Sequence, residues 1–324
     1  MSQAETNPIE AYLLSSFLGP LLRQEGWTDL TYNGESFFVE ANQGGRRKLD
    51  LEAGIPQVGA LLRQVANMAE RQFSYQSPIL DVSFGHYRLC ATFLSLTRVR
   101  DKKSYSFALR KESEGSVIQS GSPFFPGESE SILLSALAKR DSIVIGGETG
   151  SGKTELQKYL LIHMAPSTRV IVIDNVDELE QVRGNGQLDL TSWLVDENTP
   201  AGSFSALVKS SLRFDPDYLL LAEARGGEMW EGLCCAMSGH PLLITLHSST
   251  LENMPSRIAR LAQMKGSQMV YDDLLCDVKE SFQTFVLVGK HLENGMMKRQ
   301  VEEIGRLEGG EMKILFSARK GGEA

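Results

Sequence analysis

Residues 141–164, DSIVIGGETGSGKTELQKYLLIHM, contain the most specific pattern in the chain. Ser142–Ile145 predict a short buried strand, and the residues from Glu155 onward predict a helix. Between them, Gly147–Thr154 match GxxxxGKT in the strand, loop and helix order of a phosphate-binding loop. The glycines let backbone N–H groups surround an anion at a helix N-terminus, where the helix dipole favours negative charge. The segment predicts a nucleoside triphosphate site.

The predicted loop assigns roles to its own residues. Lys153 would reach the β- and γ-phosphates, and the Thr154 hydroxyl would bind Mg²⁺. The rest of the loop would contact the phosphates through its backbone; these residues are Gly147, Glu148, Thr149, Gly150, Ser151 and Gly152.

Two further predicted strands end in acidic residues. Tyr218–Ala222 predict a buried strand followed by Glu223, and RVIVIDNVDELE, residues 169–180, carries Asp174 and Glu178. Ligands of parallel α/β sheets gather at the carboxyl ends of strands, so Glu223 is the candidate to activate a water molecule. One strand-end carboxylate is more often a surface group. Two strands that end in carboxylates after a phosphate-binding loop favour a hydrolase.

His240 and His247 stand at the two ends of a predicted strand in SGHPLLITLHSST, residues 238–250. The strand between them would hold the rings roughly 20 Å apart, and their odd spacing aims them at opposite faces. One metal ion could not bind both. An isolated histidine is usually structural. His247, at the expected nucleotide end, is nevertheless the candidate to contact the γ-phosphate or water, whereas His240 would tie the strand to a neighbouring element or subunit.

The length of 324 residues favours two domains. Residues 111–130, KESEGSVIQSGSPFFPGESE, are rich in Gly, Ser, Pro and Glu and predict a linker. Beyond them, apolar strands alternate with helices, which indicates a parallel α/β domain. The predicted organisation is an α+β domain over residues 1–112, a linker over 113–130 and a P-loop α/β domain over 131–324.

Composition excludes several classes of protein. The net charge of −8 argues against a protein that coats nucleic acid. Cys90, Cys234, Cys235 and Cys276 form no CxxC pair, which predicts buried thiols in a reducing compartment rather than a zinc ribbon or a disulfide framework. No secretory signal is recognisable, and no apolar stretch approaches the roughly 20 residues that span a bilayer, so a soluble protein is expected.

Four segments together resemble the secretion-superfamily traffic ATPases, hexameric motors of type IV secretion and conjugation with relatives in type II secretion and type IV pili. In family order they are the phosphate loop GGETGSGKT, the acidic box VIDNVDEL, the Walker B segment LRFDPDYLLLAEARGGE and the histidine box SGHPLLITLHSS. TDLTYNGESFFVE, SPILDVSFGHYRLCAT and FALRK extend the resemblance into the first domain. That domain is similar to the compact one of type IV secretion and tight-adherence pilus members, and the tetracysteine insertion usual in type II secretion ATPases is absent.

The resemblance implies a RecA-like P-loop ATPase domain with a smaller α+β N-terminal domain, assembled as a ring hexamer. Such a protein would hydrolyse ATP with Mg²⁺ to power substrate transport or pilus assembly by a type IV secretion or conjugation system. It would lie in the cytoplasm, peripheral on the inner face of the cytoplasmic membrane. Its expected partners are further copies of itself and inner-membrane channel components of a secretion or pilus machine, with no specific nucleic acid.

The resemblance also implies that Asp174 and Glu178 support Glu223, and that four arginines contact the nucleotide. Arg88 and Arg110 match N-domain arginines that reach the γ-phosphate, and Arg213 and Arg225 match arginines of the Walker B segment. A lone arginine is more often a solvated surface charge, so these assignments rest on the resemblance and on the need to balance triphosphate charge.

The chain departs from the family pattern at a few positions. Asp174 and Asn175 stand where Glu-Asp is common, Ala222 replaces the usual glycine before the catalytic acid, and Glu155 replaces a small hydroxyl residue. None of these changes removes Lys153, Thr154 or Glu223, so ATP hydrolysis is still expected, and the departures leave its rate open.

Three alternatives stay open at this point. The chain could be a type IV pilus or type II secretion motor, or an ATP-gated assembly scaffold with little turnover, which steady-state phosphate release would separate from a motor. A P-loop DNA translocase or helicase is disfavoured by the acidic net charge and by the lack of an aromatic and basic stripe.

Overall fold

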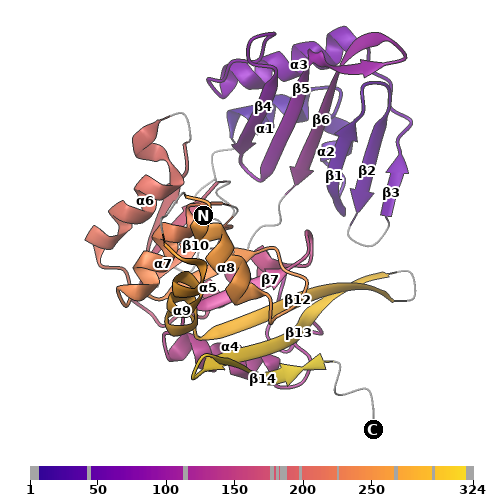
Figure 1. Cartoon of the computed structure of the whole chain (residues 1–324). Coiled ribbons are helices and arrows are strands. Elements are labelled where there is room, and N and C mark those ends of the chain that lie inside the picture. The colour runs from indigo at the N-terminus through magenta and orange to yellow at the C-terminus, as the bar shows by residue number, and fades with distance from the viewer. Residues whose placement is uncertain are drawn as a thin grey trace. The chain divides into compact units, whose positions relative to one another are not determined.

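A computed structural model describes residues 7–41, 45–111, 116–175, 179, 182, 188–196, 199–224, 226–265, 269–293 and 296–318. The chain divides into two compact units, Met1–Ser113 and Glu114–Ala324 (Figure 1).

Unit 1 is an antiparallel sheet covered by helices on one face (Figure 1). The sheet has the order β3-β2-β1-β6-β5-β4. Its strands are β1 (Trp27–Tyr32), β2 (Phe37–Ala41), β3 (Gly45–Lys48), β4 (Ile79–Phe84), β5 (Tyr87–Val99) and β6 (Lys102–Lys111). Its helices are α1 (Pro8–Ser15), α2 (Gly19–Leu22) and α3 (Ile55–Met68).

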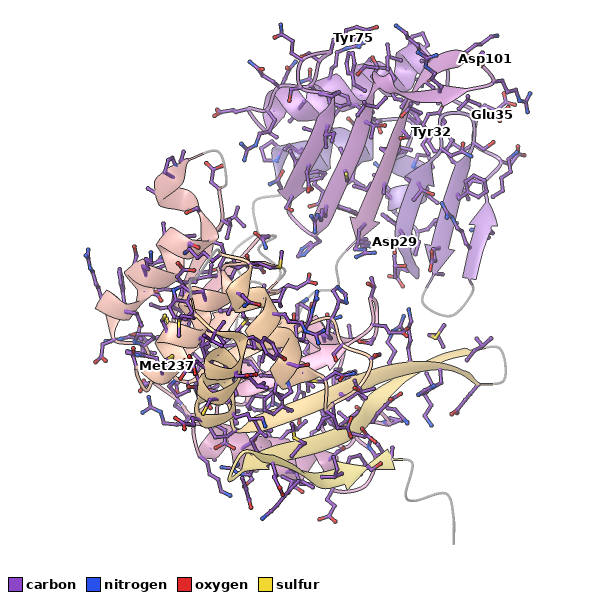
Figure 2. The ribbon with its side chains drawn as sticks, viewed as in Figure 1. Asp29, Tyr32, Glu35, Tyr75, Asp101 and Met237 are labelled. Carbon is purple, nitrogen blue, oxygen red and sulfur yellow. The ribbon has the colours of Figure 1, made fainter. Side chains whose placement is uncertain are left out.

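The two faces of this sheet differ, as alternation along an antiparallel strand predicts. Leu30, Leu89 and Leu109 are buried in one cluster with the helices. The intervening residues of β5 and β6, such as Arg88 and Cys90, are half-buried or exposed. In Figure 2, Asp29 lies toward one end of the sheet, while Tyr75, Glu35 and Asp101 lie at the other end.

Unit 2 is built on a sheet of eight strands in the order β14-β13-β12-β7-β11-β10-β8-β9. The strands are β7 (Ile143–Gly147), β8 (Arg169–Asp174), β9 (Asp189–Leu194), β10 (Tyr218–Leu221), β11 (Leu242–Leu246), β12 (Thr284–Glu293), β13 (Met296–Glu308) and β14 (Glu311–Ser317). The helices are α4 (Ser129–Ala138), α5 (Lys153–Ile162), α6 (Phe204–Ser211), α7 (Met229–Met237), α8 (Met254–Gln263) and α9 (Tyr271–Ser281), with 3₁₀ turns η2 (Pro200–Gly202) and η3 (Leu212–Phe214).

Helices cover both faces of this sheet, which explains why its central strands are apolar along their whole length. Ile143 and Ile145 of β7 are buried in one cluster with residues of α4 and α5. Val144, which lies between them, is buried in a second cluster with residues of α6, α7, α8 and α9. Unit 2 is therefore a three-layer α/β structure.

The strand order decides which residues meet at the sheet edge. β12, β7, β11, β10, β8 and β9 run parallel, so their carboxyl ends lie at one edge. In space, β11 and β10 separate β7 from β8, although β8 follows β7 in the chain. The residues after β7, β11, β10 and β8 are therefore neighbours in that order.

Part of the segment predicted as a linker, residues 113–130, packs on unit 2. Ile118, Phe124 and Phe125 are buried in the cluster that contains α4 and α5. Residues 113–115 lie outside the described residues. The polar composition of the segment does not reveal these buried apolar residues, because they are few and irregularly spaced.

The prediction of buried cysteines is confirmed for Cys235 alone, and Cys234 is half-buried. All four thiols are free, and Cys235 is buried, but Cys90 and Cys276 are exposed. Cys90 is exposed because it occupies an alternate position of β5, on the face of the sheet away from the helices. Within the described residues, every helix is too short or too polar to cross a membrane.

Glu130 fastens the start of unit 2 to helix α5. Its carboxylate accepts hydrogen bonds from the hydroxyls of Ser120 and Tyr159 and, at 2.9 Å, from the N–H of Gly121. The bonds from Ser120 and Tyr159, helped by Gly121, outweigh desolvation and hold the pKa of Glu130 below its ordinary value of 4.5. Burial, and then the bond to Glu130, raises the pKa of Tyr159 to about 12, so its hydroxyl stays a donor.

We expect Glu130→Gln to lower the melting temperature above pH 5, because the amide cannot accept all three hydrogen bonds. The shift should be about 2–4 °C, the size expected when a domain of this length loses about 1 kcal/mol. A depressed carboxyl pKa stabilises the fold above the unfolded pKa, so the difference should shrink as pH falls below 4.5. Calorimetry between pH 7 and pH 3 measures it. Glu128→Gln, an exposed neighbour, is the control, and an equal shift there would contradict the assignment.

Candidate functional site

The loop between β7 and α5 surrounds the ammonium of Lys153. The Lys153 side chain is only 8% exposed, and its Nζ donates to the carbonyls of Gly147 at 3.1 Å and Glu148 at 2.9 Å. Gly152, with φ of 102°, turns the chain into α5 through a conformation that favours glycine. A Cβ on Gly147 would lie 2.3 Å from the carbonyl oxygen of Val288, so only glycine fits there. The backbone is thus shaped around one buried cation.

Further polar groups of the loop point to an anion. Ser151 is fully buried, and its hydroxyl has no hydrogen-bond partner among the residues that the structure describes. Thr154 is half-buried in the first turn of α5, where the helix dipole favours negative charge. A phosphate group can accept from these donors and from Lys153 together.

Gln157 holds α5, and with it the loop, over the central strands. This side chain is fully buried and donates from Nε2 to the carbonyls of Leu221 in β10, at 3.0 Å, and Leu243 in β11, at 3.3 Å. The sequence pattern did not single out Gln157. A polar residue on the buried side of a helix was the signal that could have revealed it.

The structure brings Glu223 and His247 together. Glu223 follows β10, His247 follows β11, and His247 Nε2 lies 2.8 Å from Glu223 Oε1. Thr245 donates its hydroxyl to the carbonyl of Ala222 at 2.5 Å, and its own carbonyl accepts from Ala224 N–H at 3.1 Å. These bonds fix the backbone on both sides of Glu223. The sequence placed both residues at one edge of the sheet but did not pair them.

Asp174 ends β8, the neighbour of β10, so it lies at the same edge as Glu223. Its side chain is buried, 4% exposed. The predicted supporting acid Glu178 and the predicted contact Arg225 lie outside the described residues.

A cleft of about 480 Å³ lies between the loop and the strand ends. Gly147, Glu148 and Thr149 line one side, together with His247, Ser248, Ser249 and Lys290. His247 therefore lines the same cavity as the predicted phosphate-binding loop. The sequence does not predict Lys290 as a site residue, because it lies in β12, far along the chain from the glycine loop.

The N-terminal arginines lie opposite each other on adjacent strands of unit 1. Arg88 of β5 is the register partner of Arg110 of β6. Arg88 pairs with Asp81 at 3.1 Å, and Arg110 pairs with Asp29 at 2.9 Å. The two arginines thus form one cationic pair flanked by two carboxylates.

The other predicted residues lie apart from the cleft. Arg213 is exposed in the turn η3, before β10. His240 precedes β11 and so lies at the edge opposite to His247. Its N–H donates to the carbonyl of Cys235 at 3.1 Å, while its buried Nδ1 has no hydrogen-bond partner in the described part of the chain.

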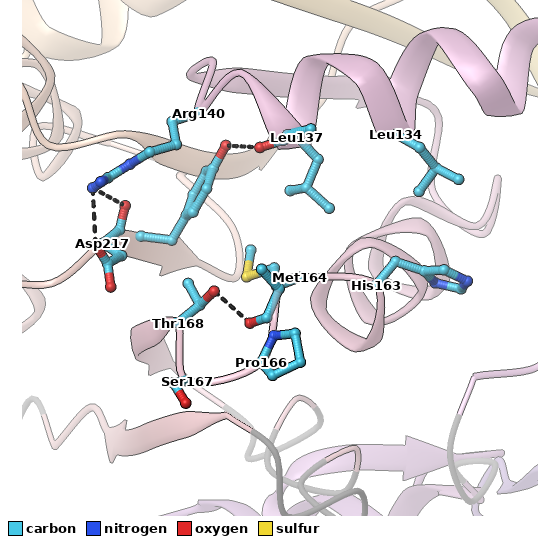
Figure 3. A pocket seen from close by; sticks show the side chains of 12 residues that line it. Leu134, Leu137, Arg140, His163, Met164, Pro166, Ser167, Thr168 and Asp217 are labelled. Atoms are coloured by element: carbon cyan, nitrogen blue, oxygen red, sulfur yellow. Dashed lines mark hydrogen bonds and ion pairs between the residues drawn. The ribbon is translucent and has the colours of Figure 1, made fainter.

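A second cavity, of about 500 Å³, lies at the amino ends of β8 and β10 (Figure 3). Leu134 and Leu137 of α4 and His163 of the loop after α5 line it. Arg140 on its rim is already paired with Asp217 at 3.1 Å. Because the strand ends that carry the acids and His247 lie at the other edge, this cavity does not belong to the candidate site.

Comparison with known proteins agrees with this arrangement. The family described as "Type II/IV secretion system protein" matches residues 120–292, just over half of the chain. An uncharacterized protein of Bacillus anthracis is 26% identical over 275 residues, which cover 84% of this chain and 60% of that protein. The type IV secretion system protein VirB11 of Brucella suis is 34% identical over 176 residues, or 52% of this chain and 47% of that protein.

The chain thus spans about half to three-fifths of the length of these curated relatives. Among solved structures, the ATPase DotB of Legionella pneumophila has a TM-score of 0.66 at 19% identity, covering 95% of this chain and 84% of that one. DotB therefore shares the fold of this protein, an N-terminal unit followed by a larger α/β unit. The family match over residues 120–292 places the chain in the Type II/IV secretion system protein family.

Proposed function

We propose that this protein is an ATPase that hydrolyses ATP at the cleft between the phosphate-binding loop and the Glu223–His247 pair, and so powers a type IV secretion or conjugation system. The observation that carries the proposal is this convergence. A buried lysine within a glycine loop and a carboxylate with its histidine lie at one sheet edge. The family membership of the chain supports ATP hydrolysis in general.

Phosphate binding would use the donors already described. The Lys153 ammonium would exchange the two carbonyl oxygens that it now contacts for oxygens of the β- and γ-phosphates. The buried Ser151 hydroxyl would gain a hydrogen-bond acceptor. Because an uncharged loop could not balance a triphosphate, the affinity should depend mainly on the lysine.

Oxygen donors at this edge fit Mg²⁺, which prefers carboxylate, hydroxyl and phosphate oxygens. Thr154 would hold the ion through its hydroxyl, with the carboxylate of Asp174 at the same edge. When bound, Mg²⁺ would neutralise phosphate charge. Few protein ligands are needed, since this ion usually keeps several water and phosphate ligands.

Glu223 would act as the general base. A carboxylate that is 19% exposed can accept a proton from the attacking water. His247 Nε2 lies 2.8 Å from one carboxylate oxygen of Glu223, so the histidine would orient the base. Its side chain is 45% exposed in the cleft and could also contact the γ-phosphate. The predicted sensor role of His247 stays part of this proposal.

The assembly and the partners are proposed from the resemblance. The protein would form a ring of six, which the mass of the purified chain with MgATP tests. It would bind inner-membrane channel components at the cytoplasmic face of the membrane. The similarity to the type IV secretion system protein VirB11 supports the proposal that this protein works in a secretion system.

Lys153→Ala should lower ATP turnover by roughly 10²-fold or more, because the cation that counters the phosphate charge is lost. Phosphate release and titration with MgADP measure the effect. Lys139→Ala, which removes an exposed lysine beyond α4, is the matched control and should behave as the parent. Hydrolysis by Lys153→Ala at the parental rate would show that the loop does not bind the reacting phosphates.

Glu223→Gln should keep ATP binding and slow hydrolysis by roughly 10²-fold or more, the scale of a lost general base. His247→Ala should slow hydrolysis less, with ADP affinity unchanged. If the histidine acts through Glu223, adding His247→Ala to Glu223→Gln should cause little further loss. Fully multiplicative effects in this double-mutant cycle would mean that the histidine acts on its own.

Arg88→Ala and Arg110→Ala should each weaken the binding of ATP by about tenfold and the binding of ADP much less, if these side chains reach the γ-phosphate. Asp81→Asn and Asp29→Asn break the same ion pairs but keep the arginines, so they serve as controls. Exposed ion pairs contribute about 0–1 kcal/mol, so all four variants should stay folded. Equal losses for the two nucleotides, or the same loss in the controls, would contradict the predicted contact.

A further inference from the structure

The hairpin formed by β12 and β13 extends past the strand that carries the phosphate-binding loop. β12 pairs in parallel with β7 only as far as Val288 and Gly147. Beyond that point, Gly289–Glu293 pair with Met296–Gln300 of β13. We call these two stretches the overhang. It lies beside the loop because β7 and β12 are neighbours in the sheet (Figure 1).

Two cations of the overhang hold consecutive carbonyl groups of the loop. Lys290 Nζ donates to the carbonyl of Thr149 at 2.7 Å. Arg299 Nε donates to the carbonyl of Gly150 at 2.8 Å. Lys290 and Arg299 are direct register partners across the hairpin, so a facing pair of side chains grips two adjacent peptide units.

This placement is electrostatically costly, which suggests that it serves the loop. Like charges directly opposite on antiparallel strands repel. The other basic groups of the overhang have acidic partners, since Lys298 pairs with Glu293 at 3.4 Å and His291 pairs with Glu302. Lys290 and Arg299 donate to loop carbonyls instead.

Holding these carbonyls fixes the direction of the loop N–H groups. In a trans peptide the C=O and the following N–H point in opposite directions. With the Gly150 carbonyl turned to Arg299, the Ser151 N–H points the other way and donates to the carbonyl of Glu148 at 3.2 Å. That same oxygen accepts from Lys153. The Ser151 N–H and the lysine ammonium therefore converge inside the loop.

We propose that Lys290 and Arg299 are positioning residues of the nucleotide site, which keep the loop N–H groups directed at the bound phosphates. The inference rests on the proposed function. The two side chains act through the backbone of the loop, and the loop holds the part of the nucleotide that ATP and ADP share. Both nucleotides therefore depend on them to the same extent.

The test measures binding of MgADP and of a non-hydrolysable MgATP analogue to the purified full-length chain, together with melting temperatures. Lys290→Met and Arg299→Met should each raise both dissociation constants by about tenfold. Lys290→Arg should restore most of the affinity, since a guanidinium can still donate to the Thr149 carbonyl. Lys298→Met, which removes a cation from the same overhang, should bind as the parent.

The outcomes separate this inference from the proposed function. If Lys153→Ala loses binding while Lys290→Met and Arg299→Met bind as the parent, the positioning role is refuted and the function stands. A loss for the ATP analogue alone would mean direct contact with the γ-phosphate and would also refute it. A lower melting temperature with parental affinities would leave the contacts merely structural. If Lys153→Ala itself binds as the parent, the proposed function fails.

Discussion

Burial of a parallel sheet between two helical layers is the constraint on which unit 2 depends. The four central parallel strands, β7, β11, β10 and β8, are buried on both faces, so their side chains are almost all apolar and charged groups lie at the strand ends. These ends carry the loop that contains Lys153, together with Asp174, Glu223 and His247. The site therefore lies at the ends of strands that are packed on both faces, and a displacement of one of these strands would disturb both clusters.

The loop itself is stabilised by hydrogen bonds that no apolar packing could replace. Lys153 is buried and charged, and a buried cation without compensation is costly. Carbonyls of the loop satisfy its ammonium, and the cations of the overhang satisfy the next carbonyls in turn. Gln157 ties the following helix to β10 and β11, so the loop and the acid at the end of β10 share one support.

Unit 1 follows a different physical rule. Its antiparallel sheet buries one face against helices and leaves polar groups on the other, where Arg88 and Arg110 pair with carboxylates from two more strands. Such exposed pairs add little stability, so they can exchange partners at small cost. Arginines held in this way are suited to meet an anionic ligand, as the family resemblance implies.

The sequence by itself determined the features that depend on short spacing. The glycine loop, the apolar strands and the acids and histidine that follow them were all predicted, because periodicity and turn chemistry act within a few residues. Only the tertiary structure decided which strand ends become neighbours. Glu223 meets His247, and Lys290 and Arg299 reach the loop, through a strand order that differs from the chain order. Phe124 and Phe125, which belong to the expected linker, pack in a cluster of unit 2 with residues far from them in the chain. Contacts between residues far apart in the chain depend on the order of the strands in the sheet, and local sequence patterns do not determine that order.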